Sequence, residues 1–136
     1  MTHERRIEIR WRDMDAYGHV NNAVYLNYLE EVRDAWVQAV LGPLGDTWDF
    51  VLAHVEIDYL HELKQDDGAV LVNCVGASVG RASIRTREEI VKLDGTVSAR
   101  ASAVIVPREP TTGRSRPLTD GEREALEQEI AGSAEA

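Results

Sequence analysis

The stretch RDMDAYGHVNNAVYLNYLEEVR, residues 12–33, decides how the rest of this sequence is interpreted. It starts as a polar loop with two carboxylates, Asp13 and Asp15, and then enters a segment with clear helical periodicity. The first backbone N–H groups of a helix are unpaired and its dipole end is positive, so a developing negative charge can be held there. A carboxylate next to such a helix start can drive the attack that creates the charge. The stretch therefore indicates a reaction centre where a helix begins.

The helix itself is expected from about Ala23 to Leu41. Asn21 or Asn22 can cap its start, and Gly42-Pro43 ends it. Apolar residues recur at steps of three and four and give the helix one wide apolar face. They are Tyr25, Tyr28, Leu29, Val32, Ala35, Trp36, Ala39 and Val40. This length and this face predict the main core element, packed against a sheet.

Alternation with a period of two predicts strands before and after this helix. The expected strands are 6–12, about 50–60, 69–79, 83–93 and about 97–105. In the last strand a row of small residues, Ala99, Ala101 and Ala103, leaves room for the bulky face of the helix. The order predicts an α+β fold in which one antiparallel sheet is wrapped on one helix.

A single domain over residues 1–136 is expected, with its core at about 5–107 and a C-terminal loop and short helix at 108–136. Thr119 and Glu122 have the spacing of a capping box, which predicts where this last helix starts. The final residues from Asp120 onward are strongly acidic, typical of a solvated helix face and a frayed tail.

Composition excludes several classes of function. The formal net charge of −9 argues against nucleic acid as a partner. No apolar run approaches the roughly 20 residues of a membrane span, and the N-terminus has no secretory signal. The one cysteine, Cys74, excludes an intramolecular disulfide and gives no metal-binding cluster. A cytoplasmic protein without a metal is expected.

The order of elements, together with the motif, resembles the hotdog fold and, within it, the 4-hydroxybenzoyl-CoA thioesterase family of acyl-CoA thioesterases. The matching residues are Asp13-x-Asp15-x-x-Gly18-His19-Val20-Asn21-Asn22-x-x-Tyr25, with Glu30, Glu31 and Arg33 on the helix. The HVNN form is also similar to acyl-carrier-protein thioesterases of the plant type and to bacterial long-chain acyl-CoA thioesterases. The resemblance implies one long central helix wrapped by a five-stranded antiparallel sheet.

For the site, the resemblance implies that Asp15 is the catalytic carboxylate and that a backbone amide near Asn22 contacts the oxyanion. It implies a homodimer or homotetramer with active sites at the subunit interface, and no cofactor other than the coenzyme A of the substrate. Family members contact the CoA phosphates from a turn between two later strands, and Arg81 and Ser83 are the matching positions here. Other arginines can assist, namely Arg85, Arg87, Arg108, Arg114 and Arg116.

Asp15 can act as a general base on water or as a nucleophile that forms an acyl-enzyme anhydride, and the sequence leaves both routes open. The simpler alternative is a loop aspartate that fixes a turn or caps the helix. Asp13 is interpreted as such a loop-ordering residue. His19 can orient the thioester or protonate the departing thiolate, or it can simply hydrogen-bond the loop.

Gly18, Val20 and Tyr25 complete the expected substrate-binding segment, although Tyr25 also suits core packing. Several other reactive side chains have a structural interpretation. Glu30 and Glu31 suit a solvated helix face, Cys74 suits the core, and His54 and His61 suit a strand surface.

The leading hypothesis is an acyl-CoA thioesterase that releases a free acid and CoA. Three alternatives stay open: an acyl-carrier-protein thioesterase, a hotdog hydratase or dehydratase, and a non-catalytic module that binds acyl thioesters. The acyl group itself is not specified by the sequence.

Overall fold

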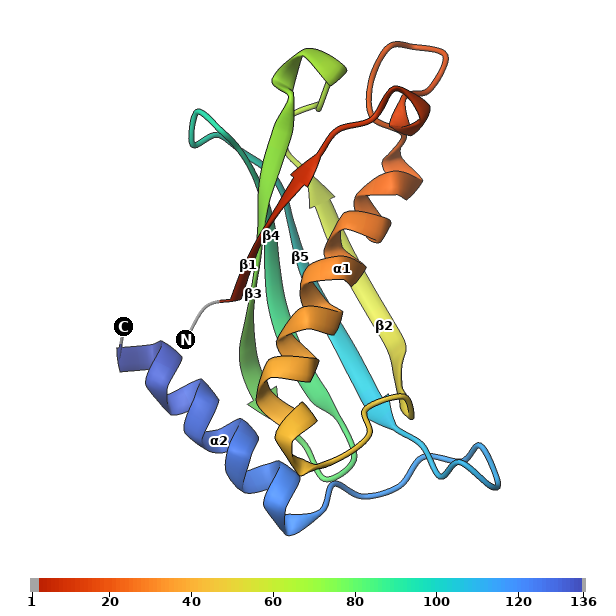
Figure 1. Ribbon diagram of the computed structural model, residues 1–136, viewed down its shortest axis with the longest axis vertical. Helices are drawn as coiled ribbons and strands as arrows, with labels where there is room; N and C mark the ends of the chain where they lie inside the picture. Colours follow the sequence, from red (N-terminus) through yellow and green to blue (C-terminus); the bar gives the residue numbers. More distant parts are fainter. Residues whose placement is uncertain (1–2, 136) are drawn as a thin grey trace.

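The computed structural model describes residues 3–135 and shows, within them, one five-stranded antiparallel sheet and two α-helices (Figure 1). The strands are β1 (His3–Glu8), β2 (Phe50–Tyr59), β3 (Ala69–Val79), β4 (Ile84–Lys92) and β5 (Val97–Pro107). The helices are α1 (Asn22–Leu41) and α2 (Asp120–Glu135). The strands lie in the order β1-β3-β4-β5-β2. The expected sheet wrapped on one long helix, followed by a C-terminal helix, is confirmed.

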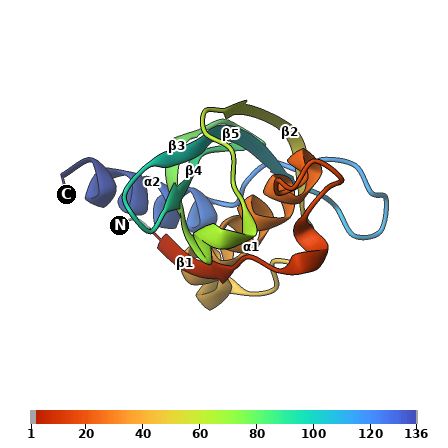
Figure 2. The same cartoon turned by 90° about the horizontal axis from the view of Figure 1, so that it is seen from above.

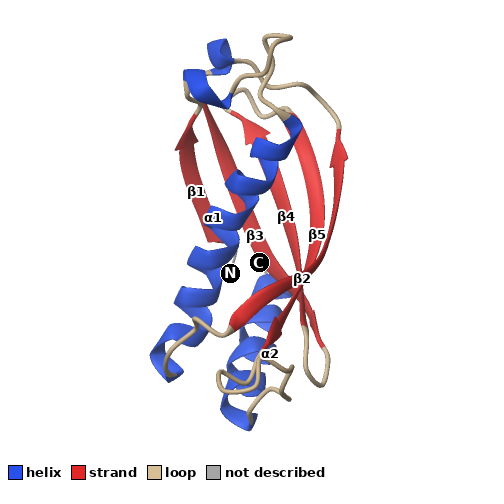
Figure 3. Cartoon of the chain, turned by 90° about the vertical axis from the view of Figure 1, so that its right-hand side faces the viewer, coloured by secondary structure: helices blue, strands red, loops and turns tan. Residues whose placement is uncertain are grey.

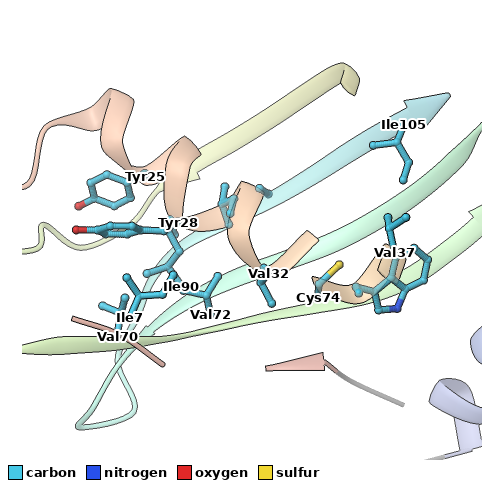
Figure 4. Close-up of a cluster of buried hydrophobic side chains, with 14 of the residues drawn as sticks. Ile7, Tyr25, Tyr28, Val32, Val37, Val70, Val72, Cys74, Ile90 and Ile105 are labelled. Atoms are coloured by element: carbon cyan, nitrogen blue, oxygen red, sulfur yellow. The ribbon is translucent and has the colours of Figure 1, made fainter. Parts of the chain in front are cut away.

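The core lies between α1 and the concave face of the sheet, which curves around the helix when viewed from above (Figure 2). Side chains from α1 interlock there with the inward rows of the strands, as Figure 4 shows for Tyr28 and Val32 above Val72 and Ile90. Leu29, Val32 and Ile90 are fully buried. Burial of such side chains is the main favourable term in folding and accounts for the position of α1.

The start of α1 is set by a side-chain cap. Asn21 is the N-cap, and its carboxamide oxygen accepts a hydrogen bond of 2.9 Å from the backbone N–H of Ala23. The helix ends at Leu41, and Gly42–Leu44, which include Pro43, form a short 3-10 turn. The sequence-based bounds of this helix therefore differ from the observed ones by one residue.

The first strand ends earlier than the sequence predicts. β1 stops at Glu8, and residues 11–13 form a 3-10 turn in which the Trp11 side chain is 79% exposed. The prediction of a strand that continues to Arg12 is therefore wrong. The cause is Asp13, whose carboxylate binds the backbone N–H of Arg10 at 3.0 Å and turns the chain out of the sheet.

β2 is the edge strand next to β5, and only one of its two sides is hydrogen-bonded in the sheet. All of its residues are exposed or half-buried, and a bulge at Ala53 interrupts its register with β5. The small residues of β5, Ala99, Ala101 and Ala103, are buried as expected. The backbone of α1 nevertheless runs closest to β1, β3 and β4.

α2 covers the part of β3 that extends beyond β1, on the same side as α1 (Figure 3). The predicted capping box is confirmed: the Thr119 hydroxyl accepts from the N–H of Glu122, and the Glu122 carboxylate accepts from the N–H of Thr119. Gly76 permits this packing, since a Cβ there would lie 2.8 Å from the Trp36 ring and 2.9 Å from Ile130. The acidic segment is thus a helix with a buried side, on which Leu126 is fully enclosed.

No helix in the described part of the chain has the length and apolar character needed to cross a membrane.

Candidate active site

A cavity of about 320 Å³ lies where the motif loop, the start of α1 and the chain after β2 meet. These three segments come together at one end of the sheet, because the end of β2 lies near the first turn of α1, to which the Tyr59 hydroxyl is hydrogen-bonded. The lining residues are Asp15, His19, Val20, Asn22, Tyr25, Tyr59, Leu60, His61 and Glu62. All three residues expected to be catalytic, Asp15, His19 and Asn22, therefore border one cleft.

Asp15 is half-buried, and the loop holds only one of its two carboxylate oxygens. Its Oδ1 accepts hydrogen bonds from the backbone N–H groups of Tyr17 at 2.9 Å and His19 at 3.3 Å. Its own N–H donates to the carbonyl of His19 at 2.8 Å. No described residue donates to Oδ2. The loop thus fixes the orientation of the carboxylate and leaves one oxygen available.

The first turn of α1 forms the second wall of the cleft. Asn22 is the first helical residue, and the Asn21 cap occupies the amide of Ala23 rather than that of Asn22. The first N–H groups of a helix have no intrahelical acceptor. The Tyr59 hydroxyl donates to the carbonyl of Asn22 at 2.8 Å and ties the end of β2 to this turn. The helix start can therefore offer N–H donors to an oxygen bound in the cleft.

His19 faces the cleft as one half of a polar pair. Its Nε2 lies 2.8 Å from an oxygen of Glu62, and both side chains are partly exposed. Glu62 was not inferred from the sequence, because it follows β2 in a segment without a motif. His61 was expected on a strand surface, and this prediction is wrong: it lies beyond β2, with Nδ1 3.1 Å from the carbonyl of Val97, and lines the cleft.

Asp13 has the structural role expected for it. The side chain is 2% exposed, and its Oδ2 accepts from the Tyr28 hydroxyl at 2.7 Å and from the N–H of Arg10 at 3.0 Å. The Arg10 guanidinium approaches Oδ1 at 3.2 Å. Burial raises the pKa of the carboxyl group, but the hydrogen bonds from Tyr28 and Arg10 outweigh it and hold the pKa below its usual value.

The remaining motif residues shape the loop. Gly18 has a φ of 81°, a conformation that side chains other than glycine rarely adopt, and it closes a turn back to Asp15. Val20 is buried and donates its N–H to the carbonyl of Leu63. Tyr25 packs edge-on against Tyr59, and its hydroxyl accepts from the N–H of Leu63 at 3.0 Å. Tyr25 therefore lines the floor of the cleft and packs the core as well.

Arg81 and Ser83 are not near this cleft within one chain. They lie in the turn between β3 and β4, at the opposite end of the sheet and next to the start of α2. The carbonyl of Arg81 accepts from the N–H of Leu118, and the Arg123 guanidinium donates to the carbonyl of Gly80. Any contact of Arg81 with a ligand at Asp15 would require a second subunit.

A buried ion pair between α1 and β4 was not predicted from the sequence. The Arg33 Nε and Nη2 atoms donate to the two oxygens of Glu88 at 2.7 and 2.8 Å, and the Thr86 hydroxyl donates to Glu88 at 2.7 Å. Burial lowers the pKa of Arg33, but the bonds to Glu88 outweigh it and raise that pKa. Burial raises the pKa of the neighbouring Cys74 thiol, as expected for a core cysteine.

A second cavity of about 450 Å³ lies between the C-terminal half of α1 and the first residues of β2. Glu30 borders it and is exposed, and Glu31 is also exposed, as expected of a solvated helix face. Its walls are otherwise mainly apolar, including Val37, Phe50 and Leu52. Within residues 3–135, no group of three or more His, Cys, Asp and Glu side chains is arranged to hold a metal ion.

The Asp15 cleft has the parts needed for acyl transfer to water. A carbonyl oxygen placed at the first turn of α1 would be polarised by N–H donors, while the free Asp15 oxygen could activate water or attack the carbonyl carbon. His19 could donate a proton to a departing group.

Comparisons with known proteins identify relatives of the whole chain. The sequence pattern of the Thioesterase-like superfamily matches residues 9–126. Long-chain acyl-CoA thioesterase FadM of Escherichia coli (strain K12) is 27% identical over 130 residues, which cover 93% of this chain and 98% of FadM.

Solved structures resemble the whole fold. A thioesterase from Thermus thermophilus, solved in complex with coenzyme A and Zn, has a TM-score of 0.83 and 32% identity, and 95% of each chain is covered. A structure described as a predicted thioesterase from Bacillus stearothermophilus has a TM-score of 0.85 and 26% identity, and covers 96% of this chain and 97% of its own.

Proposed function

Because the chain belongs to the Thioesterase-like superfamily and is a thioester hydrolase of the hotdog fold, we propose that its substrate is an acyl-CoA. The products are a free acid and CoA. The observation that carries this proposal is the arrangement of Asp15, with one oxygen fixed by loop amides and the other unpaired among the described residues, beside the start of α1. The names of FadM and of the Thermus thermophilus structure support CoA as the carrier.

In the proposed reaction the thioester carbonyl oxygen lies at the first turn of α1 and accepts a hydrogen bond from the backbone amide of Asn22. Asp15 either removes a proton from the attacking water or attacks the carbonyl carbon to form an anhydride, which water then hydrolyses. The C–S bond breaks as the tetrahedral intermediate collapses. His19, oriented by Glu62, protonates the departing thiolate or orients the thioester.

We include a homodimer in the proposal, formed by pairing of two β2 edges. β2 is ten residues long, and one side of it has no partner strand among the described residues. Large apolar side chains are exposed near both of its ends: Trp48 and Leu52 at the start, Tyr59 and Leu60 at the finish. An antiparallel two-fold pairing would bring these two groups together and remove the exposed edge. Each Asp15 cleft would then lie at the subunit interface.

The expected contacts of Arg81 and Ser83 with the CoA phosphates stay part of the proposal and require the partner subunit. The absence of a cofactor other than CoA, and the cytoplasmic location, also stay predictions. The alternatives are a carrier-protein substrate, hydration of an enoyl thioester, and binding without turnover.

A thiol-release assay tests the proposal. Aromatic, short-chain and long-chain acyl-CoAs are offered to the purified protein, and free CoA is followed with a thiol reagent. We expect release from at least one acyl-CoA class. Crotonyl-CoA is included because hydration would remove its enoyl absorbance without liberating thiol. Hydration alone, hydrolysis of acyl-carrier-protein thioesters alone, or tight binding without any release would each reject the acyl-CoA hydrolase.

A further inference from the structure

His61 is a titratable side chain at the Asp15 cleft to which the proposed reaction gives no role. It lies just beyond the end of β2 and lines the cleft together with Asp15. Its backbone is held on both sides by β5. The N–H of His61 donates to the carbonyl of Ser98 at 3.1 Å, and the carbonyl of His61 accepts from the Ser98 hydroxyl at 2.6 Å. The imidazole therefore borders the cleft from a segment that is tied to the sheet.

The hydrogen bond of the His61 ring fixes which of its nitrogens carries the proton. Nδ1 lies 3.1 Å from the backbone carbonyl oxygen of Val97, and a carbonyl oxygen can only accept. The proton of the neutral ring is therefore on Nδ1, which leaves a lone pair on Nε2. Nε2 has no hydrogen-bond partner among the described residues, and the side chain is exposed to water. The ring is thus arranged as a proton acceptor at the rim of the cleft.

The nucleophilic route for Asp15 needs such an acceptor. When the free Oδ2 of Asp15 attacks the thioester carbonyl carbon, the C–S bond breaks and the thiolate leaves with the electron pair, to be protonated by His19 or by solvent. Asp15 is then one half of an anhydride and has no charge with which to activate water. Hydrolysis of that anhydride therefore requires a second base in the cleft.

Glu62 and His19 are already engaged with each other. One oxygen of Glu62 lies 2.8 Å from Nε2 of His19, and the other lies 3.4 Å from the Nζ of Lys64. A carboxylate with a cationic or N–H partner at each oxygen is a weaker proton acceptor than a free one. Because Glu62 accepts from Nε2 of His19, it orients that ring toward the role of a proton donor.

The two tyrosines of the cleft are engaged as well. The Tyr25 hydroxyl accepts from the N–H of Leu63 at 3.0 Å, and the Tyr59 hydroxyl donates to the carbonyl of Asn22 at 2.8 Å. Burial raises the pKa of Tyr59, so this hydroxyl keeps its proton. Among the described titratable residues that line the cleft, His61 is therefore the best placed to take a proton from water once Asp15 is acylated.

We propose that His61 is the base of the second half of the reaction, in which water hydrolyses an acyl anhydride at Asp15. Water attacks the acyl carbonyl carbon while Nε2 of His61 takes one of its protons. The bond between that carbon and the Asp15 oxygen breaks, its electron pair restores the carboxylate, and the free acid leaves. The imidazolium then gives its proton to solvent. The inference rests on the proposed function and selects the nucleophilic route for Asp15.

Pre-steady-state thiol release by His61→Asn tests this role. Asparagine can keep an N–H donor for the Val97 carbonyl but has no ring nitrogen to accept a proton. We expect the first thiol to be released at the unsubstituted rate, as a burst of about one equivalent per site, followed by a steady-state kcat that is about a hundredfold lower. Mass spectrometry of the quenched variant should detect acylated protein.

His54→Asn is the matched control, because His54 is an exposed histidine of β2 that does not line the cleft. It should leave both kinetic phases unchanged. Hydroxylamine provides a rescue, since it attacks an anhydride without the help of a base. After subtraction of the reaction without protein, hydroxylamine should restore steady thiol release in His61→Asn but not in Asp15→Asn, which cannot form the anhydride.

An unchanged kcat in His61→Asn overturns the inference, and so does a lower kcat without a burst and without acylated protein. Urea unfolding checks that the variant is folded, and His61→Gln is measured in the same way if His61→Asn is not. Failure of the proposed function gives a different result, because the unsubstituted protein then releases no thiol from any acyl-CoA.

Discussion

Asp13 and Asp15 are two residues apart, but their carboxylates differ in exposure and in the number of oxygens that receive hydrogen bonds. Asp13 is 2% exposed and both of its oxygens have donors, from Arg10 and Tyr28. Asp15 is half-buried, and only its Oδ1 has donors among the described residues. A buried carboxylate whose two oxygens both have donors stabilises the fold and is not accessible to a substrate. The contrast favours a structural role for the buried polar groups around α1 and supports the proposal that the open cleft at its start carries the chemistry.

The largest effect on stability is expected at the buried ion pair. Glu88→Gln leaves the Arg33 guanidinium buried beside a neutral partner, which predicts a loss of about 3–5 kcal/mol in the free energy of unfolding. Urea unfolding measures it. The matched control is the double variant Arg33→Met/Glu88→Leu, which removes both charges and should recover most of the loss. If the Glu88→Gln protein were as stable as the unsubstituted one, the Arg33–Glu88 ion pair would not stabilise the fold.

Asp13→Asn is expected to have the next largest effect on stability. The substitution keeps the size of the side chain but removes the charge and turns one acceptor of the Tyr28 and Arg10 donors into a donor. A loss of about 1–3 kcal/mol in the free energy of unfolding is expected, with turnover per folded molecule close to the unsubstituted value. Urea unfolding and thiol release are measured on the same sample. A collapse of turnover in a fully folded variant would assign Asp13 to the chemistry.

The pH dependence of stability follows from the same carboxyl group. Its pKa in the folded protein lies below the ordinary value of 3.8, so the unfolded chain binds more protons as the pH approaches that value. The stabilisation that the ionised Asp13 carboxylate contributes is fully present above the ordinary pKa of 3.8 and is lost as the pH falls through the lowered pKa of the folded protein. Unfolding free energies between pH 7 and pH 3 should therefore fall below about pH 4, and less steeply in Asp13→Asn. Parallel curves for the two proteins would contradict this.

A smaller effect is expected at the helix cap. Asn21→Ala removes the acceptor for the Ala23 amide and should lower the free energy of unfolding by about 1 kcal/mol. Asn27→Ala is the control, because Asn27 is exposed within α1 and alanine is a better helix former. Equal effects of the two substitutions on denaturant unfolding would show that the cap does not set the start of the helix.

The fold could be predicted largely because local patterns specify it. The apolar periodicity and the caps placed α1 within one residue, and the alternation located each later strand. The end of β1 could not be predicted in this way. Its pattern continues to Trp11, and only the contact of Asp13 with the Arg10 amide and with Tyr28 shows where the chain turns away.

The candidate site also contains residues that local sequence patterns predict and residues that only tertiary contacts bring together. Asp15, His19 and Asn22 border the same cleft because one short loop and one helix start carry them. The motif alone was therefore enough to predict that these three residues lie close together. Glu62 and Tyr59 reach the cleft because the tertiary structure brings the end of β2 to the first turn of α1, which no local pattern encodes. The Arg33–Glu88 pair had a signal: Glu88 occupies an inward position in an alternating row with Ile84, Thr86 and Ile90, and Arg33 lies on the apolar face of α1.

Thiol release from a saturating acyl-CoA by Asp15→Asn shows whether the Asp15 carboxylate drives thioester hydrolysis. The substitution can keep the loop acceptor at Oδ1 and removes the negative charge of the carboxylate, whose Oδ2 receives no hydrogen bond from a described residue. We expect kcat to fall by about a hundredfold or more, equal to about 3 kcal/mol of barrier, with an unchanged free energy of unfolding. Undiminished turnover by the folded variant would show that Asp15 is not the catalytic carboxylate.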